Sequence, residues 1–235
     1  MSRLTCLMSV ALAGCSAPPP LGASCLPDGS AVLRTDRVEV SVAAETFSLR
    51  VTLPDGTSLL ETAGGPGVTT VAPRGDWRQV GEEAPWVEGT QVADVTCGED
   101  LVRVAVRSEG DDLPVGIVEI AAAEDPRALS LTFTSEGMPP ESHQARTRWT
   151  FRQAEQDRFY GMGERFDEAE HAGNELIVWA EEGCLFACDE ETATYFPVPY
   201  ALKPPHLGVL LDDTRFPRVR IDFPRHGGHV GFVTG

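Results

Sequence analysis

Short runs in which apolar and polar residues alternate with a period of two extend along most of the chain. The clearest runs are residues 37–42, 47–61, 101–108, 129–137, 146–151 and 218–223, and residues 206–213 are more continuously apolar. This period is typical of β-strands with one buried face. Pro54-Asp55-Gly56 divides the second run and predicts a hairpin turn. No segment keeps the helical period of 3.6 beyond about two turns.

This pattern predicts an all-β fold, a large antiparallel β-sandwich. Turn formers are abundant, with 23 Gly and 18 Pro, and they fall between the apolar runs. No repeat of fixed period argues for a propeller or a solenoid. Because no shift in composition divides residues 31–235, we expect one domain there, and 235 residues is a length that a single sandwich fills.

The charge balance narrows the choice of partners. The chain carries 36 acidic and 19 basic residues, a formal net charge of −17 at pH 7. A field of that sign repels phosphate backbones, so the composition argues against a nucleic-acid partner.

The N-terminal residues predict export. Residues 1–14 contain one Arg and an apolar run too short to span a bilayer as a helix, which is typical of a signal peptide. Leu12-Ala13-Gly14-Cys15 resembles a bacterial lipoprotein signal, in which Cys15 is lipidated and becomes the mature N-terminus; an ordinary secretory signal is the alternative. Residues 15–30 are predicted to be a Pro-containing tether. The expected location is the bacterial membrane surface, periplasmic or outside the cell, with a lipid anchor as the membrane contact.

Export changes how the cysteines are interpreted. Cys25, Cys97, Cys184 and Cys188 remain in an oxidising compartment and allow three pairings. We favour Cys25–Cys97 and Cys184–Cys188, because the second two share one short loop. A zinc site at Cys184 and Cys188 is the alternative, but no second close Cys/His pair accompanies it. We predict no metal ion.

Motifs for catalysis and for cofactors are missing from the sequence. The Gly161-Met162-Gly163 stretch lacks the third glycine of a dinucleotide fingerprint, and Gly64-Gly65-Pro66-Gly67 has no Lys-Ser/Thr after it. No Ser lies in Gly-x-Ser-x-Gly. Carboxylates are plentiful between residues 164 and 191, yet abundance does not place two of them across a sugar. We therefore predict no cofactor and no catalytic residue.

Four motifs together resemble a known family. FYGMGERFD, VWAEEG, TYFPVPYAL and HLGVLLDD follow the order and spacing of the N-terminal domain of glycoside hydrolase family 31, which includes α-glucosidases and α-xylosidases. The first motif matches at Tyr160, Gly161 and residues 163–166, with Met162 where Leu is typical. The strong match covers about residues 146–223.

The resemblance implies a galactose-mutarotase-like β-sandwich that packs against a following (β/α)8 barrel. In the family that barrel carries both catalytic carboxylates, and its Trp-x-Asp-Met-Asn-Glu motif does not occur here. We therefore expect the chain to be inactive alone, as a truncated, split or degenerate member or a fragment of a longer gene. Its expected partner is an α-linked glucan or xyloside, reached through the barrel.

The resemblance also points to one substrate loop. In the family, the Asp of Trp-Asn-Arg-Asp reaches over the barrel mouth to the sugar. Counting from Trp179 places Glu182 at the Asp position, whereas the Asn and the Arg are both lost. Trp179 and Glu182 are therefore the candidate substrate-binding residues, and an exposed loop carboxylate is the alternative for Glu182.

Three functions remain in competition. The first is a non-catalytic domain that shapes the substrate entrance of a barrel. The second is a stand-alone carbohydrate-binding surface lipoprotein. The third is a mutarotase, which needs a general acid and a general base. None of the five His residues lies in a motif that matches this requirement.

Overall fold

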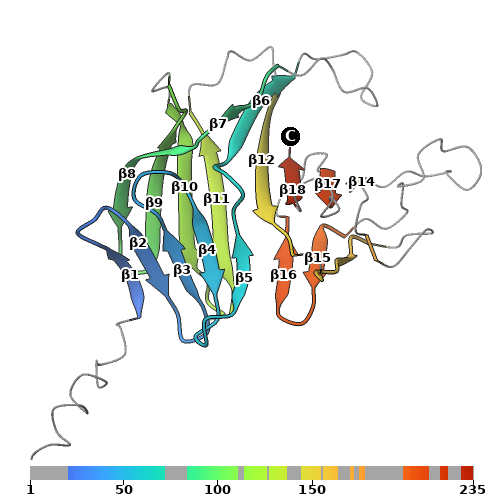
Figure 1. Ribbon diagram of the computed structural model, residues 1–235, viewed down its shortest axis with the longest axis horizontal. Coiled ribbons are helices and arrows are strands. Elements are labelled where there is room, and N and C mark those ends of the chain that lie inside the picture. The colour runs from blue at the N-terminus through green and yellow to red at the C-terminus, as the bar shows by residue number, and fades with distance from the viewer. Residues whose placement is uncertain are drawn as a thin grey trace, which may run out of the picture.

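The computed structural model describes residues 21–71, 84–110, 114–125, 127–136, 144–154, 156–163, 170–171, 175–177, 198–211, 218–221 and 229–234. These residues form strands and turns and no helix (Figure 1). Every strand pairing is antiparallel, which confirms the predicted all-β class. None of the described residues forms a helix that is long and apolar enough to cross a membrane.

Two antiparallel sheets face each other across the larger core. Sheet A has the order β1-β2-β3-β4-β5 and sheet B the order β11-β10-β9-β8. The strands of sheet A are β1 (Gly22–Cys25), β2 (Ala31–Arg34), β3 (Glu39–Val42), β4 (Leu49–Thr52) and β5 (Ser58–Glu61). Those of sheet B are β8 (Gln91–Cys97), β9 (Leu101–Arg107), β10 (Pro114–Ala122) and β11 (Leu129–Ser135).

Two further sheets extend the sandwich on the side of β5 and β11 (Figure 1). Sheet C has the order β14-β17-β18-β12-β6-β7, and sheet D has the order β13-β15-β16. Sheet C consists of β6 (Gly67–Val71), β7 (Val87–Glu88), β12 (Gln144–Arg152), β14 (Glu175–Ile177), β17 (Arg218–Ile221) and β18 (His229–Thr234). Sheet D consists of β13 (Tyr160–Gly161), β15 (Tyr200–Lys203) and β16 (Leu207–Leu210).

The alternating runs become strands because one face of each is buried. In β9, Val102, Val104 and Val106 are at most 1% exposed, while the residues between them reach the surface. In β3, Val40 and Val42 are buried in the same way. The predicted hairpin joins β4 to β5, and Asp55 in its turn accepts a hydrogen bond of 2.9 Å from the Thr57 amide. That bond holds the pKa of Asp55 below its ordinary value.

The first strand, Gly22–Cys25, lies within residues 15–30, the segment that we predicted to be a tether. Gly22–Cys25 already pairs with β2, and the Ala23 amide donates to the Glu99 carbonyl at 2.7 Å. This strand escaped the pattern analysis because Gly-Ala-Ser-Cys contains no large apolar residue. Residues 1–20, including the predicted signal peptide and Cys15, lie outside the described residues.

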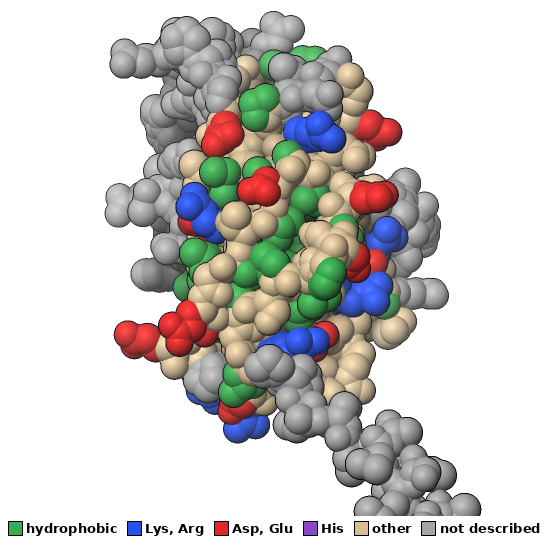
Figure 2. All heavy atoms as spheres, turned by 90° about the vertical axis from the view of Figure 1, so that its left-hand side faces the viewer, with side chains coloured by type: hydrophobic (Ala, Val, Ile, Leu, Met, Phe, Trp, Pro, Cys, Tyr) green, Lys and Arg blue, Asp and Glu red, His purple; other side chains and the backbone are tan. Residues whose placement is uncertain are grey.

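A disulfide closes one side of the sandwich. Cys25 at the end of β1 is bonded to Cys97 at the end of β8, with 5.7 Å between the two Cα atoms. This is the pairing that we favoured from the sequence, and it joins the edge strand of sheet A to the edge strand of sheet B. Figure 2 faces this side: hydrophobic side chains gather in a central band with acidic and basic side chains around them.

One aromatic side chain connects the two pairs of sheets. Trp149 of β12 has ring-centroid distances of 6.2 Å to both Phe47 and Phe133 and 6.1 Å to Phe151. Phe133 lies on β11 of sheet B, whereas Phe151 belongs to a second, smaller core with Phe159 and other residues near sheet D. Trp149 packs against both cores, so it ties sheet C to the sandwich.

The Gly64-Gly65-Pro66-Gly67 stretch is the point at which the chain passes from sheet A to sheet C. Before it, Thr62 bridges to Phe151 of β12; after it, β6 pairs with the first half of β12. The Gly89 amide donates to the Pro66 carbonyl at 2.8 Å, so two backbones meet here. A Cβ on Gly65 would collide with the Gly89 carbonyl oxygen. The stretch is therefore a backbone crossing, which requires glycine for space.

This crossing predicts an asymmetry between neighbouring glycines. Gly65→Ala should lower the free energy of unfolding by about 3 kcal/mol, because backbone atoms rather than a flexible side chain would have to move. Gly64→Ala is the matched control: nothing lies within 4 Å of its added Cβ, and we expect a change of about 1 kcal/mol or less. Urea denaturation followed by tryptophan fluorescence measures both, and equal losses would contradict the crossing.

Candidate functional site

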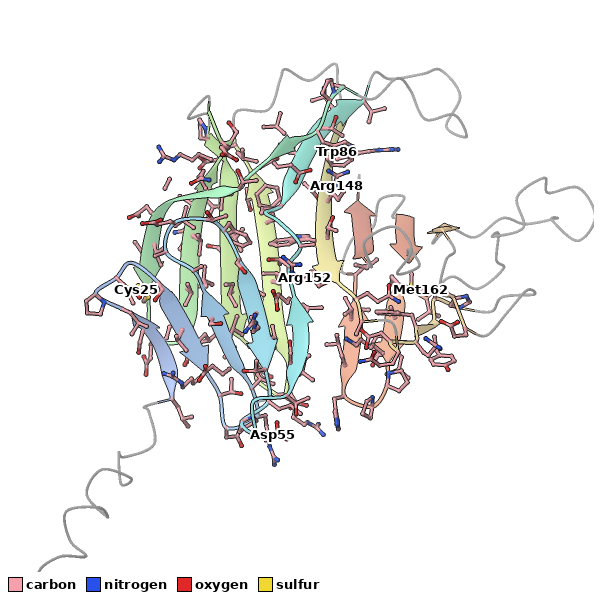
Figure 3. The ribbon with its side chains drawn as sticks, viewed as in Figure 1. Cys25, Asp55, Trp86, Arg148, Arg152 and Met162 are labelled. Atoms are coloured by element: carbon pink, nitrogen blue, oxygen red, sulfur yellow. A yellow bond between two sulfur atoms is a disulfide. The ribbon has the colours of Figure 1, made fainter. Side chains whose placement is uncertain are left out.

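The Gly161-Met162-Gly163 stretch forms a left-handed turn directly after β13. The φ angles of the three residues are 102°, 64° and 98°. Glycine adopts these values without strain, whereas Met162 does so at a cost that its surroundings must offset. Met162 is fully buried and belongs to the smaller core together with Phe151, Phe159 and Ala201. Figure 3 labels Met162 close to the strands of sheet D.

Backbone hydrogen bonds fix this turn against sheet D. The Met162 amide donates to the Tyr200 carbonyl at 2.9 Å, immediately beyond the β13–β15 ladder. Phe159, just before the turn, accepts a bond of 3.0 Å from the His171 amide and donates to a Glu170 carboxylate oxygen at 3.4 Å. The turn is thus bonded on both sides, which favours a structural role for it.

The imidazole of His171 adds a further hydrogen bond to this turn. The side chain is 1% exposed, and its Nε2 lies 3.2 Å from the Gly161 carbonyl oxygen. Because a carbonyl can only accept, Nε2 carries the proton. Nδ1 has no hydrogen-bond partner within the part of the chain that the structure describes. The hydrogen bond spans ten residues of sequence, and no motif in the sequence indicated it.

The β15–β16 hairpin is held against sheet A by a partly buried lysine. Lys203 Nζ lies 2.8 Å from Asp157 Oδ2, with side chains 18% and 13% exposed, and 3.4 Å from the Leu59 carbonyl oxygen. A small apolar crevice remains between the hairpin and the sandwich. Its lining consists of Leu60, Phe151, Arg152, Phe159, Lys203, Leu207 and Val209. The crevice carries no pair of carboxylates that could act as acid and base.

Two carboxylates elsewhere in the sandwich are engaged by arginines of β12. Arg148 pairs with Glu88, and its guanidinium lies 4.3 Å from the ring centre of Trp86 (Figure 3). Glu61 binds Arg152 at 3.1 Å through one oxygen and Arg50 at 2.8 Å through the other. These carboxylates face arginines rather than each other, which is an arrangement for structure and not for glycoside cleavage.

The predicted substrate loop falls in the part of the chain between two described strands. Trp179 and Glu182, and the cysteine pair Cys184 and Cys188, lie outside the described residues, between β14 and β15. Of the residues that the structure describes, no three His, Cys, Asp or Glu side chains are grouped so as to hold a metal ion.

The comparisons with known proteins agree with the antiparallel β-sandwich described above. The model of the glycosyl hydrolase 31 N-terminal galactose mutarotase-like domain matches residues 26–216. A search of curated proteins found no significant match.

Two solved structures are informative. A GH31 family sulfoquinovosidase from E. rectale, in complex with an aza-sugar inhibitor, is 14% identical with a TM-score of 0.56, and the match covers 86% of this chain and 30% of that one. An uncharacterized protein from Listeria monocytogenes EGD-e is 12% identical with a TM-score of 0.50, covering 90% of this chain and 27% of that one. At these identities the likeness shows a shared fold, and this chain spans less than a third of either protein's length.

The geometry of the turn predicts unequal costs at two glycines with positive φ. Gly161→Ala forces an L-residue to φ 102° and brings its Cβ within 2.5 Å of the Tyr200 carbonyl oxygen. Gly56→Ala meets only the conformational cost at φ 87°, because its Cβ would be in open space. We expect losses of at least about 3 kcal/mol and of about 1–2 kcal/mol respectively in thermal unfolding. If the Gly161→Ala and Gly56→Ala proteins were equally stable, the close contact between Gly161 and the Tyr200 carbonyl would be refuted.

Proposed function

The chain belongs to the family of glycosyl hydrolase 31 N-terminal galactose mutarotase-like domains, and we propose that it serves a larger α-glycosidase by shaping the substrate entrance of a (β/α)8 catalytic barrel. The observation that carries this proposal is the extent of the likeness: nearly all of this chain aligns with less than a third of two solved structures. A domain of this kind contributes binding surface and support, while the reacting groups belong to the barrel.

The ion-pair pattern supports a non-catalytic role. Glu61 and Glu88 are paired with arginines, and Asp157 is paired with Lys203. A retaining or inverting glycosidase needs one carboxylic acid and one carboxylate facing a common sugar, about 5–10 Å apart. Each of these three carboxylates is bound to a cation, and none of them lines the crevice between the hairpin and the sandwich.

We assign the substrate contact of this domain to the connection between β14 and β15. Family resemblance puts Trp179 and Glu182 there, and the fixed ends of the connection are Ile177 of β14 and Tyr200 of β15. Glu182 supplies the acceptor oxygens that a sugar hydroxyl requires, and Trp179 supplies apolar surface. The proposed substrate is an α-linked glucan or xyloside.

The purified chain should release no 4-nitrophenol above the buffer blank from 4-nitrophenyl α-glucoside or α-xyloside, because the Trp-x-Asp-Met-Asn-Glu motif of the catalytic barrel does not occur in its sequence. In a longer protein that continues beyond Gly235 into a barrel, Glu182→Gln should raise KM about tenfold by removing one charge-assisted hydrogen bond. Glu181→Gln is the neighbouring control and should leave KM unchanged. Hydrolysis by the chain alone, or equal effects of the two variants, would overturn the assignment.

We also propose that the protein is exported and anchored through lipid on Cys15. Support comes from Leu12-Ala13-Gly14-Cys15 in the sequence and from the Cys25–Cys97 disulfide, since structural disulfides persist in oxidising compartments. Acyl chains contribute about 0.8 kcal/mol per buried methylene, so several chains on one cysteine hold a protein at a membrane.

Cell fractionation in a bacterial host tests the anchor. The wild-type chain should sediment with membranes, and Cys15→Ser should move it to the soluble fraction because no acyl chain can be attached. Cys6→Ser is the control within the signal region and should leave the protein with the membranes. Membrane association of the Cys15→Ser protein would reject lipidation at this residue.

A further inference from the structure

The outer face of sheet D carries an exposed apolar strip. The large hydrophobic residues of this strip are Val198, Tyr200, Leu202 and Leu210, which are 48%, 41%, 40% and 64% exposed. On the opposite face of the same strands, Ala201 is buried and Val209 packs against the smaller core. Elsewhere in the described residues, only Leu21, Leu26 and Val87 among the large hydrophobic side chains are comparably exposed. The strip is therefore a concentration of apolar surface on one sheet face.

The tyrosine in the middle of this strip reaches across to Gly208. Leu202 is the ladder partner of Gly208, and Tyr200 is the ladder partner of Leu210. A Cβ on Gly208 would collide with the Tyr200 hydroxyl and lie 2.6 Å from Cζ and 2.9 Å from Cε2. The phenol ring thus occupies the space left by the missing side chain. Tyr200 is nevertheless 41% exposed, so part of its side chain remains accessible to a ligand.

Hydrogen bonds and one ion pair hold the backbone of β15 in place. The Tyr200 carbonyl accepts the Met162 amide, and the Leu211 amide donates to the Pro199 carbonyl at 2.7 Å. Lys203, on the same strand, is fixed by Asp157 and by the Leu59 carbonyl. A platform that is rigid before binding loses little conformational entropy when a ligand covers it.

We propose that this strip, centred on Tyr200, binds a neutral glycan by stacking one pyranose ring on the phenol. The C–H groups on one face of a pyranose meet the negative face of an aromatic ring, while Leu202 and Leu210 cover the sides of the sugar. The phenol hydroxyl supplies a donor and an acceptor at the edge of the strip.

Charge favours a neutral ligand over an anionic one. Val198, Tyr200, Leu202, Gly208 and Leu210 are uncharged, so the strip offers no cation for a carboxylate, sulfate or phosphate group. The chain as a whole carries a net charge of −17, which disfavours anionic polysaccharides further.

This inference rests on the proposed function, because it takes the chain to serve a carbohydrate-active protein. The two fail separately. If the chain binds no glycan at Tyr200 but Glu182 controls KM in the longer protein, only the proposal of a binding strip at Tyr200 is rejected. If Tyr200 binds glycan but Glu182 has no effect on KM, only the proposed role at the substrate entrance is rejected.

Titration of the ¹⁵N-labelled full chain with maltotriose and isomaltotriose, followed by amide chemical shifts, tests the platform. We expect shifts confined to β15, β16 and their neighbours, with a dissociation constant in the millimolar range. Tyr200→Ala should weaken binding about tenfold, the size expected for one aromatic stacking contact. Tyr200→Phe should retain affinity within about threefold, because the ring face remains.

Gly208→Ala is the sharper variant. It keeps Tyr200 but displaces the ring from the sheet, and the atoms that must move belong to a flexible side chain, so the fold tolerates it. We expect it to weaken binding as much as Tyr200→Ala. Val87→Ala, at an exposed apolar residue of β7, is the control and should bind as the wild-type chain does.

Three outcomes overturn the proposal. The first is that no amide chemical shift changes with either trisaccharide, even when the sugar exceeds about 50 mM and is in about 100-fold excess over the protein. The second is unchanged binding in Tyr200→Ala or Gly208→Ala. The third is self-association in sedimentation velocity that Tyr200→Ala abolishes while no sugar binds, which would make the strip a contact between protein chains.

Discussion

The packing of Trp149 against three phenylalanine rings is the interaction on which the arrangement of the sheets depends. Strand β12 must pair with β6 and β18 through its backbone and, at the same time, fill two cores with its aromatic side chains. Its opposite face carries Arg148 and Arg152, each bound to a carboxylate from another strand. Leu60 and Leu131 also pack against both cores, and the indole of Trp149 is the largest of these three side chains.

This packing explains why the Gly161-Met162-Gly163 turn is so closely constrained. The turn seats Met162 in the smaller core, and the carbonyl of Gly161 meets the imidazole of His171. The same core lies beneath β15, so the position of Tyr200 follows from packing that begins at Trp149. The Gly161-Met162-Gly163 motif is therefore a structural turn.

Much of the fold could be predicted from the sequence, because one-sided burial leaves a period of two that survives in strands such as β3 and β9. The strands that escaped prediction break that period for identifiable reasons. β10 contains a register shift between Pro114 and Gly116, and β8 contains one between Val92 and Asp94. A shift of one residue exchanges the buried and exposed faces, so alternation cannot be followed through it.

The candidate site was less predictable, since it depends on contacts between residues far apart in sequence. The positive φ of Gly161 and Gly163 could be expected from residue type, whereas that of Met162 could not. The Lys203–Asp157 pair and the fit of Tyr200 over Gly208 appear only once sheet D has formed. Trp179 and Glu182 were reached by family resemblance alone, and they stay predictions.

The Cys25–Cys97 disulfide has a mechanical consequence. A pull on the N-terminal segment acts first on β1, an edge strand of four residues whose hydrogen bonds to β2 would separate one after another. The covalent bond at Cys25 stops that separation and passes the load to β8, 72 residues further along the chain. Force is then shared between both sheets of the sandwich, so the domain resists unfolding when a pulling force is applied at its N-terminus.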